Sequence, residues 1–271
     1  LKGFLRAVRP ELEVVQADPA IELVLRLFSA KGLKQIAGTI QERATRVRRK
    51  PPAALASFLE QATRYEQCVE PTIRFLQGKD PSLAIRISSR DYLPEGPRFL
   101  PLEHMGSEGD PLGWAFGALG VQDRAKYLAS LFIDDLADVV REGIDPRFEL
   151  SRYGEKLAAS APSFDPLSEA LEAAPTLVDR YLDEITTELI ARHRPDILGL
   201  TVPFPGNVYG ALRIARQAKA HLPGIKVVLG GGYANTELRD LAEPRLFDHI
   251  DYVTLDDGER PFLRLLEYFE N

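Results

Sequence analysis

The chain has 271 residues, of which 45% are hydrophobic and 27% charged, and its formal net charge is -6. This composition is ordinary for a globular protein and excludes a disordered chain. The acidic balance argues against nucleic-acid binding, which normally requires a basic stripe. A single cysteine, Cys68, excludes an internal disulfide framework and a cysteine-ligated iron–sulfur cluster within this chain. No apolar run approaches the about 20 residues of a membrane span, so we expect a cytoplasmic protein that binds no membrane.

The first 19 residues are predicted to form a helix followed by a strand. Apolar side chains recur at helical spacing over residues 1–9, and Pro10 ends the helix. Residues 11–18 (ELEVVQAD) are a short β-like run. A helix and a strand with nothing before them are typical of half a βαβ unit. We therefore expect that a first strand is missing from this chain.

Residues 20–185 are predicted to be almost wholly helical. One helix opens at Pro51, and Pro71 is expected to break or kink it. Residues 80–120 are rich in proline and glycine and are expected to form an extended connection. A long helix is predicted over residues 123–141 from its buried apolar stripe. The pattern assigns no function to this helical region.

The last third of the chain alternates helices with apolar strands. Strands are predicted at residues 196–202, 225–229 and 252–255, and helices at residues 208–221, 237–241 and 261–269. This order predicts a parallel sheet that is covered on both faces, the α/β Rossmann-like (flavodoxin-like) class. The predicted domains are an α/β domain (residues 1–19 and 186–271) and a large all-α insertion (residues 20–185).

The turns after these three strands form the candidate site, because ligands of such sheets bind beyond the carboxyl ends of the strands. The candidate residues are Thr201, Val202, Pro203 and Phe204 in the first turn, Gly230, Gly231, Gly232 and Tyr233 in the second, and Asp257, Gly258 and Glu259 in the third. Three successive glycines favour close approach of a ligand to the backbone. The alternative is a tight turn that needs a positive φ.

Other chemistry-bearing residues have simpler interpretations. Capping of the last helix by Asp257 is favoured over metal binding by the carboxylates of the third turn. The histidines have no metal-binding spacing, and two of them are expected at helix ends; they are His104, His193, His221 and His249. No Ser–His–Asp pattern is present, and a buried Cys68 is expected. We therefore assign no catalytic and no metal-binding residue.

Several of these segments together resemble a known family. Residues 196–201 resemble its D-x-x-G-(L/F)-(S/T) strand end, residues 228–231 its V-x-G-G turn, and residues 258–259 its G-E turn before an L-x-x-L-L helix. The opening residues 1–18 resemble its first helix and second strand. The family is the B12 (cobalamin)-binding-type domain that precedes the catalytic barrel of many radical S-adenosylmethionine (radical SAM) enzymes.

The resemblance implies that cobalamin lies across the carboxyl ends of the strands, with its nucleotide tail near Thr201 and the glycine turn. The parent enzyme would hold a [4Fe–4S] cluster and S-adenosylmethionine in its C-terminal barrel, on a C-x-x-x-C-x-x-C motif that this chain lacks. The fragment would then not be catalytic alone, and would position a corrinoid for methyl transfer or related radical chemistry. The implied partners are the corrinoid and that barrel, and an incomplete sheet would also allow self-association.

Two alternatives remain open. The first is a degenerate domain that holds no corrinoid and acts as a structural or docking module. The D-x-H-x-x-G string by which some cobalamin modules bind cobalt does not occur in this chain, but it would fall before Leu1, so its absence does not decide between the two interpretations. The second is a nucleotide-binding enzyme of another doubly wound family. It is disfavoured because Asn235 stands where the dinucleotide fingerprint has its third glycine.

Overall fold

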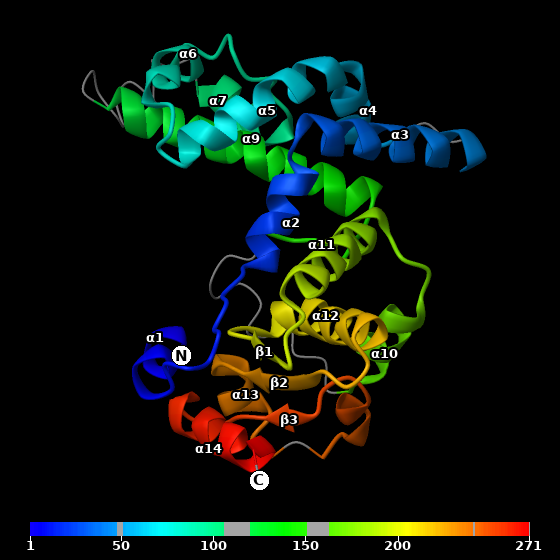
Figure 1. Ribbon diagram of the computed structural model, residues 1–271. Helices are drawn as coiled ribbons and strands as arrows, with labels where there is room; N and C mark the ends of the chain where they lie inside the picture. Colours follow the sequence, from blue (N-terminus) through cyan, green and yellow to red (C-terminus); the bar gives the residue numbers. More distant parts are fainter. Residues whose placement is uncertain (48–50, 106–119, 151–162, 241, 271) are drawn as a thin grey trace. The chain divides into compact units, whose positions relative to one another are not determined.

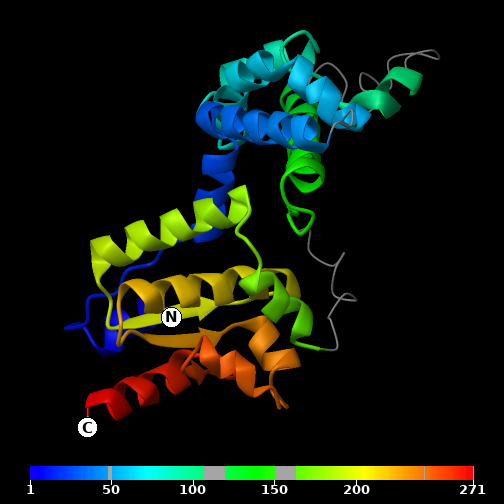
Figure 2. The same cartoon turned by 90° about the vertical axis from the view of Figure 1, so that its right-hand side faces the viewer.

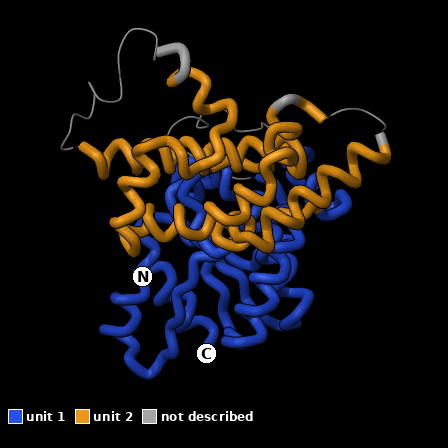
Figure 3. Tube along the Cα trace, turned by 90° about the horizontal axis from the view of Figure 1, so that it is seen from above, with its two compact units in different colours: residues 1–22, 151–175, 179–271 blue, residues 23–150, 176–178 orange. Residues whose placement is uncertain are grey.

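A computed structural model describes residues 1–47, 51–105, 120–150, 163–240 and 242–270. The chain divides into two compact units, coloured separately in Figure 3: an α/β unit (residues 1–22, 151–175 and 179–271) and a helical unit (residues 23–150 and 176–178). Most of α11 (Leu177–His193) belongs to the α/β unit, as does α10 (Asp165–Glu172). The sequence prediction placed both helices, up to residue 185, in the helical insertion.

The α/β unit is built on a parallel sheet of three strands in the described residues, in the order β1-β2-β3 (Figure 1). The strands are β1 (Ile197–Thr201), β2 (Lys226–Gly230) and β3 (Tyr252–Val253). The register pairs Thr201 with Gly230 and Leu229 with Val253. The strand positions and the parallel sheet expected from the sequence are confirmed.

Alternate side chains of β2 enter cores on opposite faces of the sheet, as the two-residue period of a strand requires. Val227 and Leu229 pack in one apolar cluster with Leu212 and Ala215 of α12 (Val208–His221). Figure 2 shows this helix running along one face of the strands. The strand is short and almost fully apolar because both of its faces are covered.

The other face of the sheet is covered by α1 (Lys2–Val8) and α14 (Glu259–Glu270). Val228 packs there with Leu5 and Phe262. Figure 1 shows both helices on the side of the sheet away from α12. The expected two-sided cover of the sheet is therefore confirmed.

A ladder of polar contacts joins α11 to α12, and each contact links residues 30 positions apart. The pairs are Asp179 with Tyr209, Asp183 with Arg213, and Thr187 with Gln217. A constant offset means that the two helices run parallel, and Figure 2 shows α11 as a further layer outside α12. The four-residue steps put each member of the ladder on one face of its helix.

Two predicted elements of the α/β unit are wrong. The predicted run at residues 11–18 forms no strand. Leu12 and Val14 instead pack against the cluster around Val228, which satisfies their apolar side chains without a strand partner. The helix predicted at residues 237–241 is α13 (Gly232–Glu237), which begins immediately after β2. A 3-10 helix, η5 (Pro244–Asp248), then leads to β3.

The helical unit packs around its longest helix, α9 (Val121–Gly143), which confirms the helix predicted at residues 123–141. Phe132 of α9 stacks on Tyr65, with ring centroids 5.5 Å apart, and Tyr65 also contacts Phe58. All three aromatic side chains are buried. α3 (Ala30–Val47), α4 (Ala53–Glu60) and α5 (Ala62–Leu76) pack against α9. They follow α2 (Pro19–Leu27), whose first residues belong to the α/β unit.

Pro71 does not break its helix, and α5 continues through it. The burial of Cys68, Val69 and Phe75 on this helix outweighs one lost backbone hydrogen bond. The extended connection predicted over residues 80–120 is also wrong in its described part. Its elements are η1 (Pro81–Leu83), α6 (Ala84–Ser88), η2 (Pro97–Phe99) and α7 (Leu100–Met105), while residues 106–119 lie outside the described residues.

A buried carboxylate explains why part of that connection is ordered. The Asp135 side chain, on α9, accepts hydrogen bonds from the backbone N–H groups of Gly96 (3.0 Å) and Arg98 (2.9 Å). These N–H groups lie at the start of η2, where no carbonyl group of the same helix is available to accept from them. A proline- and glycine-rich stretch therefore folds because a distant side chain caps it.

Candidate functional site

The turns after β1 and β2 meet at one edge of the sheet. The Val202 N–H donates to the Gly230 carbonyl (2.8 Å), and the Tyr233 N–H donates to the Val202 carbonyl (3.1 Å). These bonds continue the β1–β2 pairing beyond Thr201 and into the start of α13. The prediction that these two turns share the carboxyl edge is confirmed.

The third turn joins the same edge through α13. The Asn235 side-chain amide donates from Nδ2 to the Asp256 carbonyl (2.9 Å), and its Oδ1 accepts from the Asp256 N–H. Arg239 forms an ion pair with the Asp256 carboxylate. In the sequence, Asn235 stood out only as a departure from a glycine fingerprint, and Arg239 was not predicted as a site residue. The available signal was an asparagine and an arginine four positions apart, close after the glycine bend.

Neighbouring protein atoms restrict the glycines of the bend, and Gly231 most strongly. Gly231 has a φ of 108°, and a Cβ there would lie 2.7 Å from the Val202 carbonyl oxygen. A Cβ at Gly232 would lie 3.1 Å from the Pro203 carbonyl oxygen. A Cβ at Gly230 would lie 2.6 Å from the side-chain hydroxyl of Thr254, which follows β3. The tight-turn interpretation with a positive φ is confirmed at Gly231. Contact of this bend with a ligand stays a prediction.

The candidate residues differ in what they present to solvent. Thr201, Pro203, Gly232 and Asp257 are exposed, while Phe204, Gly230, Gly231, Tyr233, Gly258 and Glu259 are half-buried. Val202 is only 1% exposed, so its side chain belongs to the core and only its main chain contributes to the edge. Burial raises the pKa of Tyr233 above its ordinary value. The accessible rim therefore offers a hydroxyl, a proline ring and carboxylates.

The helices at the edge are capped differently from the sequence prediction. α14 begins at Glu259, two residues before its predicted start, and the Gly258 carbonyl accepts from the Phe262 N–H. Gly258 therefore occupies the position directly before the helix, and Asp257 lies one residue further away. Asn207 precedes α12, but its side chain makes no capping hydrogen bond.

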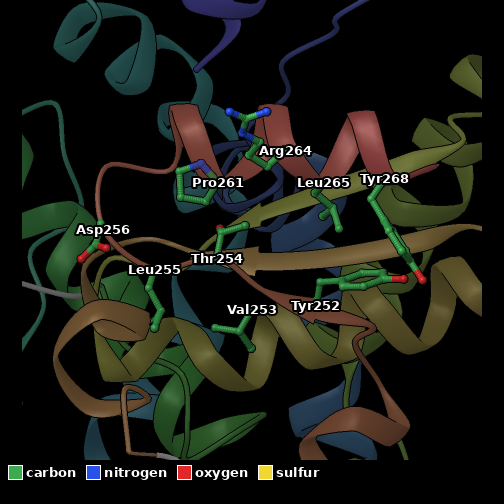
Figure 4. Close-up of a pocket in the computed structure, with 9 residues that line it drawn as sticks. All are labelled: Tyr252, Val253, Thr254, Leu255, Asp256, Pro261, Arg264, Leu265 and Tyr268. Carbon is green, nitrogen blue, oxygen red and sulfur yellow. The ribbon is translucent and has the colours of Figure 1, made fainter. Parts of the chain in front are cut away.

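An open groove of about 440 Å³ runs beside the edge strand β3 (Figure 4). It is lined by Tyr252, Val253, Thr254, Leu255 and Asp256 of the strand and its continuation, and by Pro261, Arg264, Leu265 and Tyr268 of α14. Figure 4 shows the Tyr252 and Tyr268 rings near each other at one end and Asp256 at the other. The groove therefore lies between β3 and α14 and reaches the third turn.

His193, His221 and Cys68 match their structural interpretations. His193 and His221 lie at the ends of α11 and α12, as predicted. Burial lowers the pKa of His249, and the His104 side chain lies outside the described residues. Cys68 is buried within α5, and burial raises the pKa of its thiol.

Metal binding and membrane insertion find no support in the described part of the chain. Among those residues, no group of three or more histidine, cysteine, aspartate or glutamate side chains is arranged to hold a metal ion. None of the helices formed by the same residues has the length and apolarity needed to cross a membrane.

Comparison with known proteins agrees with this geometry. No curated protein and no solved structure matches the chain. Residues 171–266, however, match the family model of the B12 binding domain. The matched segment runs from α10 into α14 and contains all three turns of the carboxyl edge. This segment of the chain is therefore similar to a B12-binding domain.

Proposed function

We propose that the α/β unit binds a corrinoid across the carboxyl edge of its sheet. The observation that carries this proposal is the meeting of three turns at one edge within the segment that matches the B12-binding domain. Open parallel sheets bind their ligands at this edge. The match to the family model supports a corrinoid as the ligand, and the meeting of the three turns supports the carboxyl edge as the binding site.

The exposed residues of the edge suit the periphery of a corrinoid, which carries many amide groups. Thr201 would exchange hydrogen bonds with such amides, and Asp257 and Glu259 would accept from them. Phe204 would offer an apolar wall to the cofactor's flat rings. Val202 and Gly231 would act indirectly, since they hold two turns together. The cofactor supplies the cobalt chemistry when bound, while the chain binds and orients it.

Spectroscopy after dialysis tests the proposal directly. Protein incubated with hydroxocobalamin should retain the absorbance of about one corrinoid per chain. The Thr201→Ala/Asp257→Ala double variant should retain clearly less. Lys226→Ala is the matched control, because Lys226 is exposed at the opposite end of β2 and should leave binding unchanged. No retained absorbance in the unaltered protein would refute corrinoid binding.

The wider proposal places this chain in a radical SAM enzyme that uses the corrinoid for methyl transfer or related radical chemistry. Its support is the motif resemblance of the strand-end turns and of the helix that opens the chain. The [4Fe–4S] cluster and S-adenosylmethionine would belong to a C-terminal barrel of the same polypeptide. The coding sequence that follows Asn271 tests this proposal: it should encode three cysteines spaced as C-x-x-x-C-x-x-C, and their absence would refute it.

One observation favours the alternative of a docking or structural module. The positive φ of Gly231 and its close contact with the Val202 backbone account for a glycine at this position without any ligand. Within the described residues β1 and β3 are also edge strands, and free strand edges can pair with another chain. A module of this kind would show no corrinoid absorbance and would self-associate in a light-scattering measurement as its concentration rises.

A further inference from the structure

Asn235 is the residue through which the third turn is attached to α13. Its amide bonds both main-chain groups of Asp256, the carbonyl through Nδ2 and the N–H through Oδ1. A side-chain amide that satisfies both groups of one residue imitates the pairing of a neighbouring strand. It does so just beyond β3, where the strand itself ends at Val253.

The turn held in this way has an unfavourable backbone conformation. Asp256 has a φ of 64° and Gly258 a φ of 79°, so two of its residues are left-handed. A left-handed residue other than glycine is uncommon and persists where its surroundings hold it. The bonds from Asn235 act on the main chain of Asp256 and oppose relaxation of this conformation. The Arg239 ion pair acts only on the Asp256 side chain.

The position of Asn235 is itself determined by the rest of the edge. α13 starts at Gly232, and the Tyr233 N–H bonds the Val202 carbonyl, which ties the helix to the first turn. Asn235 then ties the helix to the third turn. The three turns therefore form one connected series, and Asn235 makes its last link.

We propose that Asn235 is a positioning residue that holds the turn from Asp256 to Glu259 in the conformation a bound corrinoid meets. This inference rests on the proposed function of the edge. Released from Asn235, the turn would populate that conformation only part of the time. The apparent affinity for the corrinoid would fall by the same fraction.

The test compares three single variants with the unaltered protein. Asn235→Ala removes both bonds. Asn235→Asp keeps an acceptor for the Asp256 N–H but loses the donor to its carbonyl. Thr236→Ala is the matched control on the same helix, because the Thr236 hydroxyl bonds the Gly232 carbonyl within α13. Each variant is measured twice: amide hydrogen exchange of Asp256 in the ligand-free protein, and titration with hydroxocobalamin.

In Asn235→Ala we expect about tenfold faster exchange at the Asp256 amide and about tenfold weaker corrinoid binding. Asn235→Asp should lie between this variant and the unaltered protein, and Thr236→Ala should change neither quantity. Circular dichroism checks that each variant is folded, which the partial exposure of Asn235 favours.

The other possible outcomes overturn different steps of the proposal. Unchanged exchange at Asp256 in Asn235→Ala would show that the amide does not hold the turn. Faster exchange with unchanged affinity would show that the turn is held but that the corrinoid does not depend on it. If the unaltered protein binds no corrinoid, the proposed function fails and the corrinoid-positioning role fails with it, while the exchange rates still decide whether Asn235 holds the turn.

Discussion

The buried ion pair between α11 and α12 provides the sharpest test of how the α/β unit is held together. Arg213 is only 3% exposed, and its guanidinium donates to both carboxylate oxygens of Asp183. Its Nε also lies 3.7 Å from Oδ1 of Asp179, which is equally buried. We consider the substitution Arg213→Met, which keeps an unbranched side chain in the core but removes the charge.

The expected loss follows from burial. Removing one partner of a buried ion pair typically costs about 3–5 kcal/mol, because the remaining charge has been taken out of water. Asp183 is 24% exposed and can regain some hydration, whereas Asp179 cannot. We therefore expect Arg213→Met to lower the free energy of unfolding of the α/β unit by about 3 kcal/mol, at the lower end of that range.

Two further variants separate charge from packing. Asp179→Asn/Arg213→Met neutralises the more deeply buried carboxylate and should recover about half of the loss, because less uncompensated charge remains. Gln217→Ala removes the next rung of the same ladder, the bond from Gln217 to Thr187 (3.1 Å). That bond is neutral and partly exposed, so its removal should cost about 1 kcal/mol or less.

The assay must report on the α/β unit alone, because the chain has two compact units and one unfolding midpoint would mix them. Hydrogen exchange of the α12 backbone amides, measured across a urea series, gives the opening free energy of this unit. The reasoning is refuted if Arg213→Met loses less than about 1 kcal/mol, or if the double variant is no more stable than Arg213→Met.

The other predictions concern the glycine bend and the helical unit. In urea unfolding, Gly231→Ala should destabilise the α/β unit by about 2 kcal/mol more than Gly224→Ala. Both glycines have a positive φ, but only a Cβ at position 231 would collide with backbone atoms, those of Val202. Equal losses of stability in the two variants would contradict this. Burial raises the pKa of Asp135 from 3.8 to about 6. A folded-state pKa above the unfolded value gives stability that is present below about pH 4 and is lost as the pH rises through about 6, roughly 3 kcal/mol in total. Asp135→Asn should remove this pH dependence of the free energy of unfolding. If that free energy changes with pH in the same way in the variant and in the unaltered protein, Asp135 is not the cause. The Cys68 thiol is buried and its pKa is raised, so it should react with a thiol reagent only after denaturant is added, and rapid native labelling would show that it is accessible.

The parallel sheet and its site edge could be predicted from local patterns. Short apolar strands such as residues 225–229 alternate with amphipathic helices, and this periodicity is written in neighbouring residues. The parallel arrangement then puts all strand ends on one side, so Thr201, Gly230 and the turn after β3 had to share an edge. That inference needed no knowledge of which side chains touch.

Predictions failed where a contact between distant residues decided the outcome. The β-like run at residues 11–18 has the composition of a strand, but Leu12 and Val14 are satisfied by packing near Val228. The proline-rich stretch before residue 105 has the composition of an extended segment, yet Asp135, 37 positions beyond Arg98, supplies the carboxylate that caps its turn. Propensity describes only the local chain, and tertiary contacts override it.

The sequence alone thus determined the α/β class, the strand order along the chain and the edge that gathers its polar turns, because these follow from the period of apolar residues and the geometry of parallel strands. Only the tertiary structure decided how that edge is held. The space beside Gly231 is taken by the Val202 backbone, and the amide of Asn235 holds Asp256 in a left-handed conformation. Both facts depend on atoms more than 20 positions apart in the chain, whose distances are fixed by packing and by hydrogen bonds that no local pattern records.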